Sequence, residues 1–224
     1  MTGTRAPRPV QLVVFDFDGT LCDSADIKTV AFHRLYLDEH GPAFADEVEQ
    51  FHLANAGLPR FDKIRFIESE MLGTEPSDER IDEVAAWFSE LVEDAVVAAP
   101  MFEGVQEFLE ASHERVPLTI ASATPTGELR RIVKRKGIEH FFRAIEGSPE
   151  SKADIISRYS AIYDVAPAAT AMVGDQPSDA AAAEATGAVG IMIADEAPWV
   201  AHHIRVDTFS QAAAQLNRML PPPT

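Results

Sequence analysis

The first strong feature of the hydrophobic pattern is a short apolar run, VQLVVF, at residues 10–15. A parallel strand that is buried on both faces has a near-continuous apolar sequence of this kind. The run leads directly into DFDGT at residues 16–20, so two aspartates follow the strand one residue apart. Ligands of open α/β sheets bind outside the carboxyl ends of the strands. We therefore predict that Asp16 and Asp18 lie where the chemistry takes place.

The next stretch, residues 24–98, has no strand pattern and shows helical periodicity instead. Its clearest example is the spacing i, i+3, i+4, i+7, i+8 of Val84, Trp87, Phe88, Leu91 and Val92. Pro100 marks the end of the stretch, because the residue before a proline is biased away from helix. We predict an all-helical cap domain over 24–98, inserted into a core domain made of 1–23 and 99–224.

Strand and helix patterns alternate after the proline. Such βα alternation is typical of a doubly wound parallel sheet, so the predicted fold class is α/β. The predicted helices are 105–109, 127–136, 153–162, 180–186 and 209–220. The predicted strands are 117–121, 144–145, 169–173, 189–193 and one that ends at 206.

Further polar residues follow the other predicted strands or begin helices. Ser151 is a predicted N-cap, which places Lys152 on the first turn of a helix, where free N–H groups favour an anion. All these ends face one crevice in a doubly wound sheet. The residues expected there are Asp16, Asp18, Ser122, Lys152, Asp175 and Asp179.

Four converging carboxylates need more positive charge than one lysine supplies. Two like charges about 4 Å apart repel by roughly 4 kcal/mol at a surface-like dielectric. Oxygen ligands without histidine or cysteine favour Mg²⁺ over Zn²⁺, and a Mg²⁺ held by few carboxylates commonly takes a phosphate oxygen as well. The pattern therefore predicts a phosphoryl-transfer site with a carboxylate nucleophile.

Composition narrows the partners. The chain has 19 Lys and Arg against 36 Asp and Glu, a formal net charge of −17, which argues against nucleic acid or an anionic membrane as a partner. There is one cysteine, no apolar run long enough for a membrane span and no secretory signal pattern. These features lead us to expect a cytoplasmic protein that acts on a small molecule.

Four ordered motifs resemble those of the haloacid-dehalogenase-like (HAD) hydrolase superfamily. They are DFDGT at 16–20, Ser122, Lys152 and GDQPSD at 174–179, and together they span most of the chain. The helical stretch between the first two resembles the α-helical cap of that superfamily, in its phosphoglycolate phosphatase and β-phosphoglucomutase-like branch. The resemblance implies a Rossmann-like core.

The resemblance also implies a role for each motif residue. Asp16 would attack phosphorus and form an aspartyl-phosphate, and Asp18 would protonate the leaving oxygen and later activate water. Mg²⁺ would be held by Asp16, the Asp18 backbone carbonyl and Asp175, with Asp179 orienting that shell. Ser122 and Lys152 would bind the transferring phosphoryl oxygens. The implied substrate contacts also include Gly19, Thr20 and Ala123.

The cap contributes one further candidate. Between residues 26 and 94 there are 17 acidic and six basic side chains, yet Arg60, Lys63 and Arg65 lie within six residues of one another. A related phosphomutase type carries an arginine in this region of the cap. We predict that Arg60, with Lys63, reaches the substrate's phosphate or a second anionic group.

The leading interpretation is a Mg²⁺-dependent phosphatase of a small phosphorylated metabolite. Dehalogenases and phosphonatases of this fold lack the second aspartate, so Asp18 argues against both. A β-phosphoglucomutase-like isomerase keeps both aspartates, but that type carries a histidine where this chain has Lys28. A non-catalytic scaffold would have lost a motif residue. Phosphoglycolate, sugar phosphates, nucleotides and amino-acid-linked phosphates all stay candidate substrates, and the oligomeric state stays open.

Overall fold

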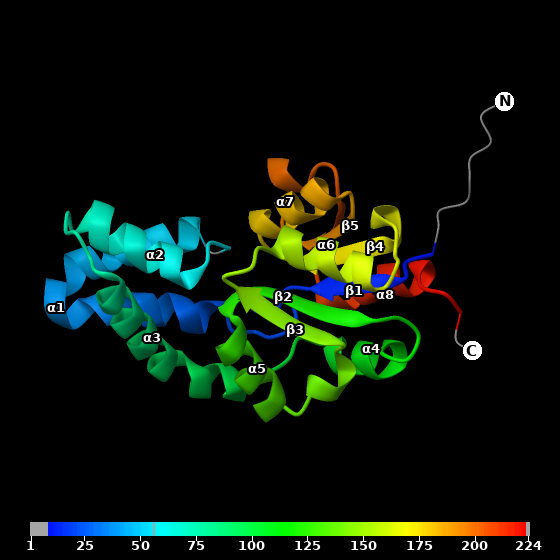
Figure 1. The fold of residues 1–224 in the computed structure, drawn as a ribbon, viewed down its shortest axis with the longest axis horizontal. Coiled ribbons are helices and arrows are strands. Elements are labelled where there is room, and N and C mark those ends of the chain that lie inside the picture. The colour runs from blue at the N-terminus through cyan, green and yellow to red at the C-terminus, as the bar shows by residue number, and fades with distance from the viewer. Residues whose placement is uncertain (1–8, 56, 223–224) are drawn as a thin grey trace.

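The core of the molecule is a six-stranded parallel sheet with strand order β3-β2-β1-β4-β5-β6 (Figure 1). The computed structural model describes residues 9–55 and 57–222. The chain fills one side of β1 first and then returns to fill the other, which is the doubly wound topology. The α/β prediction is therefore confirmed. The strands are β1 (Leu12–Phe15), β2 (Leu118–Pro125), β3 (Ala144–Ser148), β4 (Thr170–Gly174), β5 (Val189–Ile193) and β6 (Ile204–Val206).

Each face of the sheet has its own helical layer, because side chains alternate along a strand. Leu12 and Val14 face α6 (Lys152–Ile162) and α7 (Pro177–Thr186). Val13 and Phe15 face the opposite layer, where the Phe15 ring lies 5.9 Å from that of Phe108. Figure 1 shows the two layers on either side of the sheet. The second layer consists of α4 (Val105–Ser112), α5 (Thr126–Arg135) and α8 (Phe209–Met219).

Three helices occupy the stretch between β1 and α4, and they lie together at one end of the molecule (Figure 1). They are α1 (Ala25–Ala54), α2 (Arg60–Phe66), which continues into a π-helical turn at Ile67–Met71, and α3 (Asp78–Ala98). We call α1, α2 and α3 the helical module. Val84, Phe88 and Val92 of the predicted stripe on α3 are buried, whereas Trp87 is 36% exposed. No helix among the described residues is long and apolar enough to cross a bilayer.

Two neighbouring chain segments join the helical module to the sheet. The N–H of Asp23 donates to the carbonyl of Pro100 at 3.0 Å, and the N–H of Phe102 donates to that of Leu21 at 3.1 Å. We propose this paired crossing as the boundary between the domains predicted at 1–23 with 99–224 and at 24–98. Residues 1–8, 56 and 223–224 of that division lie outside the described residues.

A tight turn follows β1 and brings two loops of the core together. Gly19 sits at φ +79°, and a Cβ placed there would lie 2.3 Å from Oδ2 of Asp175. Next to it, the Thr20 hydroxyl donates to Oδ1 of Asp175 at 2.7 Å. Position 19 therefore requires glycine both for its backbone conformation and for the space that the Asp175 carboxylate fills.

Gly19→Ala is therefore expected to destabilise the protein more than an equivalent change at an open position. Gly137 is the matched control, because it has φ +75° and no neighbour within 4 Å of its Cβ position. Gly137→Ala should lose about 1–2 kcal/mol of unfolding free energy from the left-handed backbone alone. Gly19→Ala should lose a further 1–3 kcal/mol or so from the clash, as measured by urea denaturation. Equal losses at the two positions would show that the Asp175 contact carries no such constraint.

Candidate active site

The carboxyl ends of β1, β2 and β4 and the beginning of α6 meet at one place, as the strand order requires. Asp16 follows β1, Ser122 lies within the extended end of β2, and Asp175 follows β4. Lys152 is the first residue of α6 after the N-cap Ser151, whose side chain accepts the N–H of Asp154. The motif residues that lie far apart in the sequence thus come from adjacent elements.

A buried chain of charges links Asp16, Lys152 and Asp179. The Lys152 Nζ atom is 2.8 Å from Oδ2 of Asp16 and 2.6 Å from Oδ1 of Asp179. All three side chains are buried. Burial alone would lower the pKa of Lys152, but the two carboxylates outweigh it and raise the pKa above its usual value. Lys152 is therefore a fixed cation at this site.

Asp179 is held by the backbone as well as by the lysine. Its Oδ2 accepts the N–H of Gln176 at 2.9 Å and that of Asp175 at 3.2 Å. Gln176 and Asp179 form a capping box at the start of α7. Both oxygens of Asp179 are thus engaged by protein donors, and this carboxylate fixes the position of Lys152 and of the loop that carries Asp175.

Three carboxylates lie close enough to share one cation. Ligand atoms of Asp16, Asp175 and Asp179 all lie within 4.8 Å of one another. The Asp175 carboxylate accepts hydrogen bonds from Thr20 at 2.7 Å and from the Gln176 amide at 2.6 Å. These contacts orient Asp175 toward Asp16.

The electrostatics of this group fit a divalent cation. Burial raises the pKa of Asp16 to about 8 against the opposing effect of Lys152, and Asp179 and Asp175 raise it further. Burial, together with Asp179, raises the pKa of Asp175 to about 6. Lys152 therefore does not by itself keep these carboxylates ionised, and an added cation would. An all-oxygen donor set suits a hard divalent ion.

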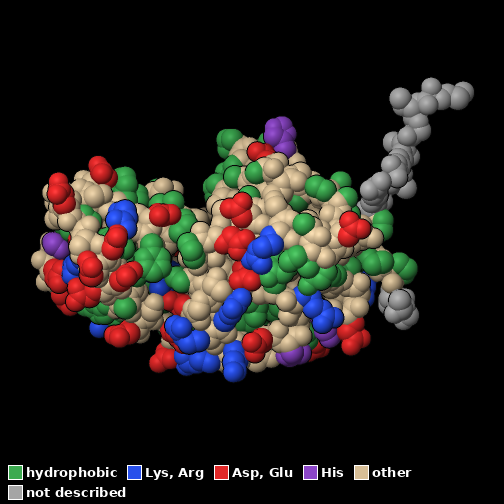
Figure 2. Space-filling model, viewed as in Figure 1, with side chains coloured by type: hydrophobic (Ala, Val, Ile, Leu, Met, Phe, Trp, Pro, Cys, Tyr) green, Lys and Arg blue, Asp and Glu red, His purple; other side chains and the backbone are tan. Residues whose placement is uncertain are grey.

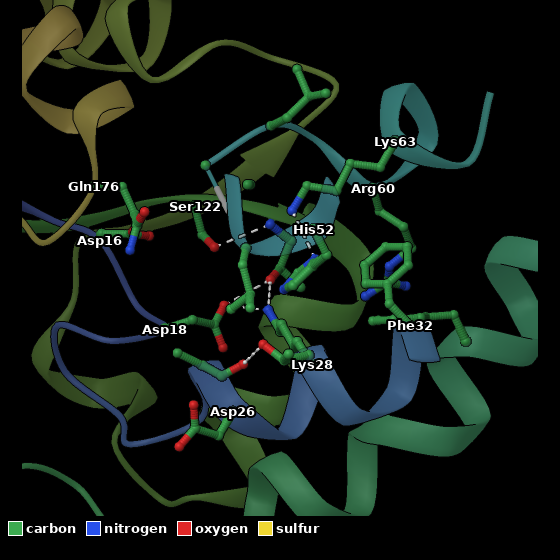
Figure 3. A pocket seen from close by; sticks show the side chains of 18 residues that line it. Asp16, Asp18, Asp26, Lys28, Phe32, His52, Arg60, Lys63, Ser122 and Gln176 are labelled. Atoms are coloured by element: carbon green, nitrogen blue, oxygen red, sulfur yellow. Dashed lines mark hydrogen bonds and ion pairs between the residues drawn. The ribbon is translucent and has the colours of Figure 1, made fainter. Parts of the chain in front are cut away.

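The Asp18 carboxylate points away from that group, toward the helical module (Figure 3). Its Oδ1 accepts the Ser24 hydroxyl at 2.7 Å, and its Oδ2 accepts Lys28 Nζ and, at 3.0 Å, the Thr124 hydroxyl. Burial raises the pKa of Asp18, but Lys28 and these hydroxyls outweigh burial and hold the pKa below its usual value. Asp18 is therefore ionised in this arrangement, and any metal contact from position 18 would have to come from the backbone carbonyl.

A cavity of about 210 Å³ lies between these groups and the helical module. Asp16, Asp18, Ser122 and Ala123 form its floor. Ser122 is held at its place because its Oγ accepts the N–H of Thr124 at 3.1 Å. The opposite wall carries cationic and aromatic side chains. Figure 3 labels five of them, Lys28, Phe32, His52, Arg60 and Lys63. The cavity thus joins a carboxylate floor to a basic and aromatic roof.

Lys63 and His52 form a buried pair on that wall. Lys63 Nζ is 3.1 Å from Nδ1 of His52 and 5.5 Å from the centre of the Phe32 ring. Burial, then Lys28 and Arg60, lower the pKa of Lys63 to about 7. Burial and Lys63 lower the pKa of His52 to about 3, so the imidazole is neutral.

Arg60 lines the cavity but directs its terminal nitrogens elsewhere. Nη1 and Nη2 bind the Glu128 carboxylate at 2.6 and 2.7 Å, and Nη1 also donates to the Ser89 hydroxyl at 2.6 Å. Its Nε is buried without a partner among residues 9–55 and 57–222. Contact of Arg60 with substrate stays a prediction, and Nε is the donor left for it.

Gly19 and Thr20 lie against Asp175, outside the residues that line the cavity.

Sequence analysis missed Thr124 and Gln176, and assigned no role to His52. It did not predict a contact between Lys28 and Asp18, although a lysine ten residues after Asp18 on a cap helix was a signal for contact with that carboxylate. No sequence signal identified Glu128 as the partner of Arg60, because the pairing joins α2 to α5 across 68 residues.

Comparison with curated proteins gives two kinds of relative. The chain is 29% identical over 185 residues to tyrosine-protein kinase PtkA of Mycobacterium tuberculosis, a match that covers 79% of this chain and 60% of the relative's length. It is 26% identical over 198 residues to phosphoglycolate phosphatase of Synechococcus elongatus, covering 82% and 84% of the two chains. The chain thus spans 60% of the length of the kinase relative.

Solved structures share the fold. A haloacid dehalogenase-like family protein, SP0104 of Streptococcus pneumoniae, superposes with a TM-score of 0.70 at 23% identity, covering 92% of this chain and 98% of the other. The β-phosphoglucomutase of Clostridium difficile superposes with a TM-score of 0.73 at 14% identity, covering 93% and 98%. The model of the haloacid dehalogenase-like hydrolases matches residues 10–187, and the chain belongs to that family.

Proposed function

We propose that the protein is a Mg²⁺-dependent phosphatase of a small phosphorylated metabolite. One observation carries the proposal: Asp16 lies against Lys152 and beside Asp175, while Asp18, two residues on, faces the same cavity. A nucleophile, a charge-neutralising group and an acid/base thus surround one space. The phosphoglycolate phosphatase among the relatives supports this class of reaction.

In the first half-reaction, an oxygen of the Asp16 carboxylate attacks phosphorus and the bond from phosphorus to the ester oxygen breaks. Asp18 must take up a proton before this step, because Lys28 and the hydroxyls around it hold it ionised in the structure. It then donates that proton to the leaving oxygen, so the alcohol departs neutral. Lys152 and the Ser122 hydroxyl bind phosphoryl oxygens, since both lie at the floor of the site. Mg²⁺, held by Asp16, the Asp18 carbonyl and Asp175 and oriented by Asp179, would neutralise charge on the phosphoryl group.

In the second half-reaction, water attacks the phosphorus of the aspartyl-phosphate and the bond to Asp16 breaks. Asp18 removes a proton from that water. This step needs an ionised Asp18. Contacts with Lys28, Ser24 and Thr124 hold Asp18 in that state. Inorganic phosphate and the free Asp16 carboxylate result.

The substrate's remaining part would face the helical module. Lys63 and Arg60 line that wall, and we propose them as contacts for the substrate's polar or anionic end. Gly19 and Thr20 support the site through Asp175 in the structure, and Ala123 lines the cavity floor.

Transfer to an acceptor other than water is the second candidate. The same nucleophile would serve a phosphomutase. The mycobacterial relative is named a tyrosine-protein kinase, and kinases also transfer a phosphoryl group to an acceptor other than water. A phosphomutase would convert one sugar phosphate isomer into the other and depend on a bisphosphate primer. A phosphatase releases inorganic phosphate stoichiometrically, so phosphate release measured beside isomer analysis separates the two.

The variant Asp16→Asn is expected to lose at least about a thousandfold in kcat with p-nitrophenyl phosphate and Mg²⁺, because an amide is no nucleophile toward phosphorus. Asp23→Asn is the matched control, since Asp23 is an exposed aspartate of the same loop. That control should keep its activity. Hydrolysis by Asp16→Asn at the rate of the control would exclude the proposed nucleophile.

Mg²⁺ is expected to raise the melting temperature of the protein, because it binds the folded carboxylate group and not the unfolded chain. At about 100 times its Kd the ion should add roughly 5–10 °C. Asp175→Asn should abolish this shift. Asp195→Asn should retain it, since Asp195 also follows a strand but is exposed and outside the acidic group. An equal Mg²⁺ shift in both variants would exclude Asp175 as a ligand.

Lys63→Met is expected to raise KM by about tenfold for a substrate with a second anionic group and to change kcat little, because the lysine contacts a part that does not react. Arg65→Met is the control, since Arg65 lies two residues on but is exposed and pairs with Asp78. The metabolite used would be the best substrate from a panel of phosphorylated compounds. An unchanged KM in Lys63→Met would remove Lys63 from the substrate contacts.

A further inference from the structure

The contact between Arg60 and Glu128 is a buried ion pair with two parallel hydrogen bonds. Nη1 donates to Oε2 at 2.6 Å and Nη2 to Oε1 at 2.7 Å. The exposed fractions of the two residues are 6% and 3%. Ser89 donates a further hydrogen bond to Oε2 of Glu128 at 2.6 Å, and the guanidinium lies 4.4 Å from the centre of the Phe88 ring. The pair is therefore fully enclosed and well oriented.

The pair joins the two parts of the molecule. Arg60 begins α2 and Ser89 lies on α3, both in the helical module, whereas Glu128 lies in the first turn of α5, six residues after Ser122. The covalent connections between these parts are only the two adjacent segments at Asp23 and Pro100. Contacts such as this pair therefore decide how the module sits over the cavity.

A second contact shows that the module lies directly on the core beside the cavity. A Cβ on Gly57 would lie 2.1 Å from Oγ of Ser178, at the start of α7. The loop before α2 thus touches one side of the site while Arg60 reaches α5 on the other. The arrangement is a closed one.

Other ion pairs between the same helices are of a different kind. Arg131 and Arg135 of α5 pair with Glu93 and Asp94 of α3. Figure 2 shows basic side chains gathered at the surface near α5, and the exposed side-chain fraction of Arg131 is 57%. Exposed pairs of this kind contribute little to stability.

We infer that Glu128 is a positioning residue, which fixes how the helical module closes over the active site because its carboxylate compensates the buried charge of Arg60. The closure itself follows from contacts in the structure, and only its effect on kinetics rests on the proposed phosphatase function.

Removing one charge of the buried pair disfavours closure more than removing both charges does. When the module opens, Arg60 and Glu128 both become hydrated, so the intact pair gains little net free energy from closure. If only one charge is removed, closure must bury the other without a partner, and the open form becomes favoured. If both are replaced by apolar side chains of similar volume, closure no longer buries an unpaired charge.

We expect a definite order of rates in hydrogen–deuterium exchange of peptides covering α2 and the beginning of α5, measured for wild type, two single variants, their double variant and one control. Glu128→Leu and Arg60→Met should each exchange about tenfold faster than wild type there, because a partner is missing in the closed form. The double variant should exchange more slowly than either single variant. Glu93→Gln, which removes partly exposed ion pairs with Arg131 and Arg135 at the same α3–α5 contact, should match wild type.

Steady-state kinetics of the same proteins with p-nitrophenyl phosphate supply the second readout. Glu128→Leu should raise KM by about tenfold and leave kcat within about threefold, because substrate binding must then also close the module. Circular dichroism melting identifies any variant that fails to fold, and Glu128→Gln, which keeps the shape of the side chain, replaces Glu128→Leu in that case.

The two proposals fail in distinguishable ways. Absence of hydrolysis in the wild-type protein would remove the phosphatase proposal but leave the exchange experiment valid. Exchange at α2 and α5 that is unchanged in both single variants, or faster in the double variant than in either single one, would overturn the role of Glu128. Faster exchange spread over all strands would indicate loss of fold stability in place of opening, and would overturn it too.

Discussion

The rest of the structure depends on one constraint, which is the burial of several carboxylates at a single edge of the sheet. Lys152 lies between Asp16 and Asp179, at 2.8 and 2.6 Å, and is the cation that this cluster contains. Burial nevertheless raises the pKa of Asp16 to about 8, so the lysine leaves a deficit of positive charge. Three carboxylates, Asp16, Asp175 and Asp179, against the single Lys152 leave an excess of negative charge that one divalent cation would balance.

The buried carboxylates also restrict which residues the neighbouring loops can carry. Glycine stands where the loops approach the carboxylates most closely: a Cβ on Gly19 would lie 2.3 Å from the Asp175 carboxylate, and one on Gly174 would lie 2.2 Å from the Cγ of Asp179. Asp179 also accepts the N–H groups at the start of α7 and so serves as helix cap and charge partner at once. The same residues therefore shape the loops and set the electrostatics, which explains why the motif is short and dense.

The pattern of hydrophobic and polar residues was enough to predict the strands and the polar residues that follow them. β5 has the predicted bounds, and the ends of β1, β2 and β4 with the start of α6 bring together Asp16, Ser122, Asp175 and Lys152, because parallel strands share one edge. The sequence pattern could not predict the contacts between the helical module and the core. Helical periodicity predicts that α2 and α3 exist but not how they pack on α5, so Arg60 was assigned to substrate without sight of Glu128. The side-chain direction of Asp18 likewise depends on Lys28, which α1 brings over the site.

On the mechanism proposed above, the position of the helical module also sets the state of Asp18. Asp18 follows β1 in the core, but Lys28, which holds its carboxylate, belongs to α1, and Thr124 joins them from β2. Any movement that lifts α1 from the core removes Lys28 from Asp18 and admits water to Asp16. The attacking water of the second half-reaction would then compete with bulk solvent. The buried Arg60–Glu128 pair is therefore linked to Asp18, the proposed acid/base group, because both contacts require the helical module in the same position.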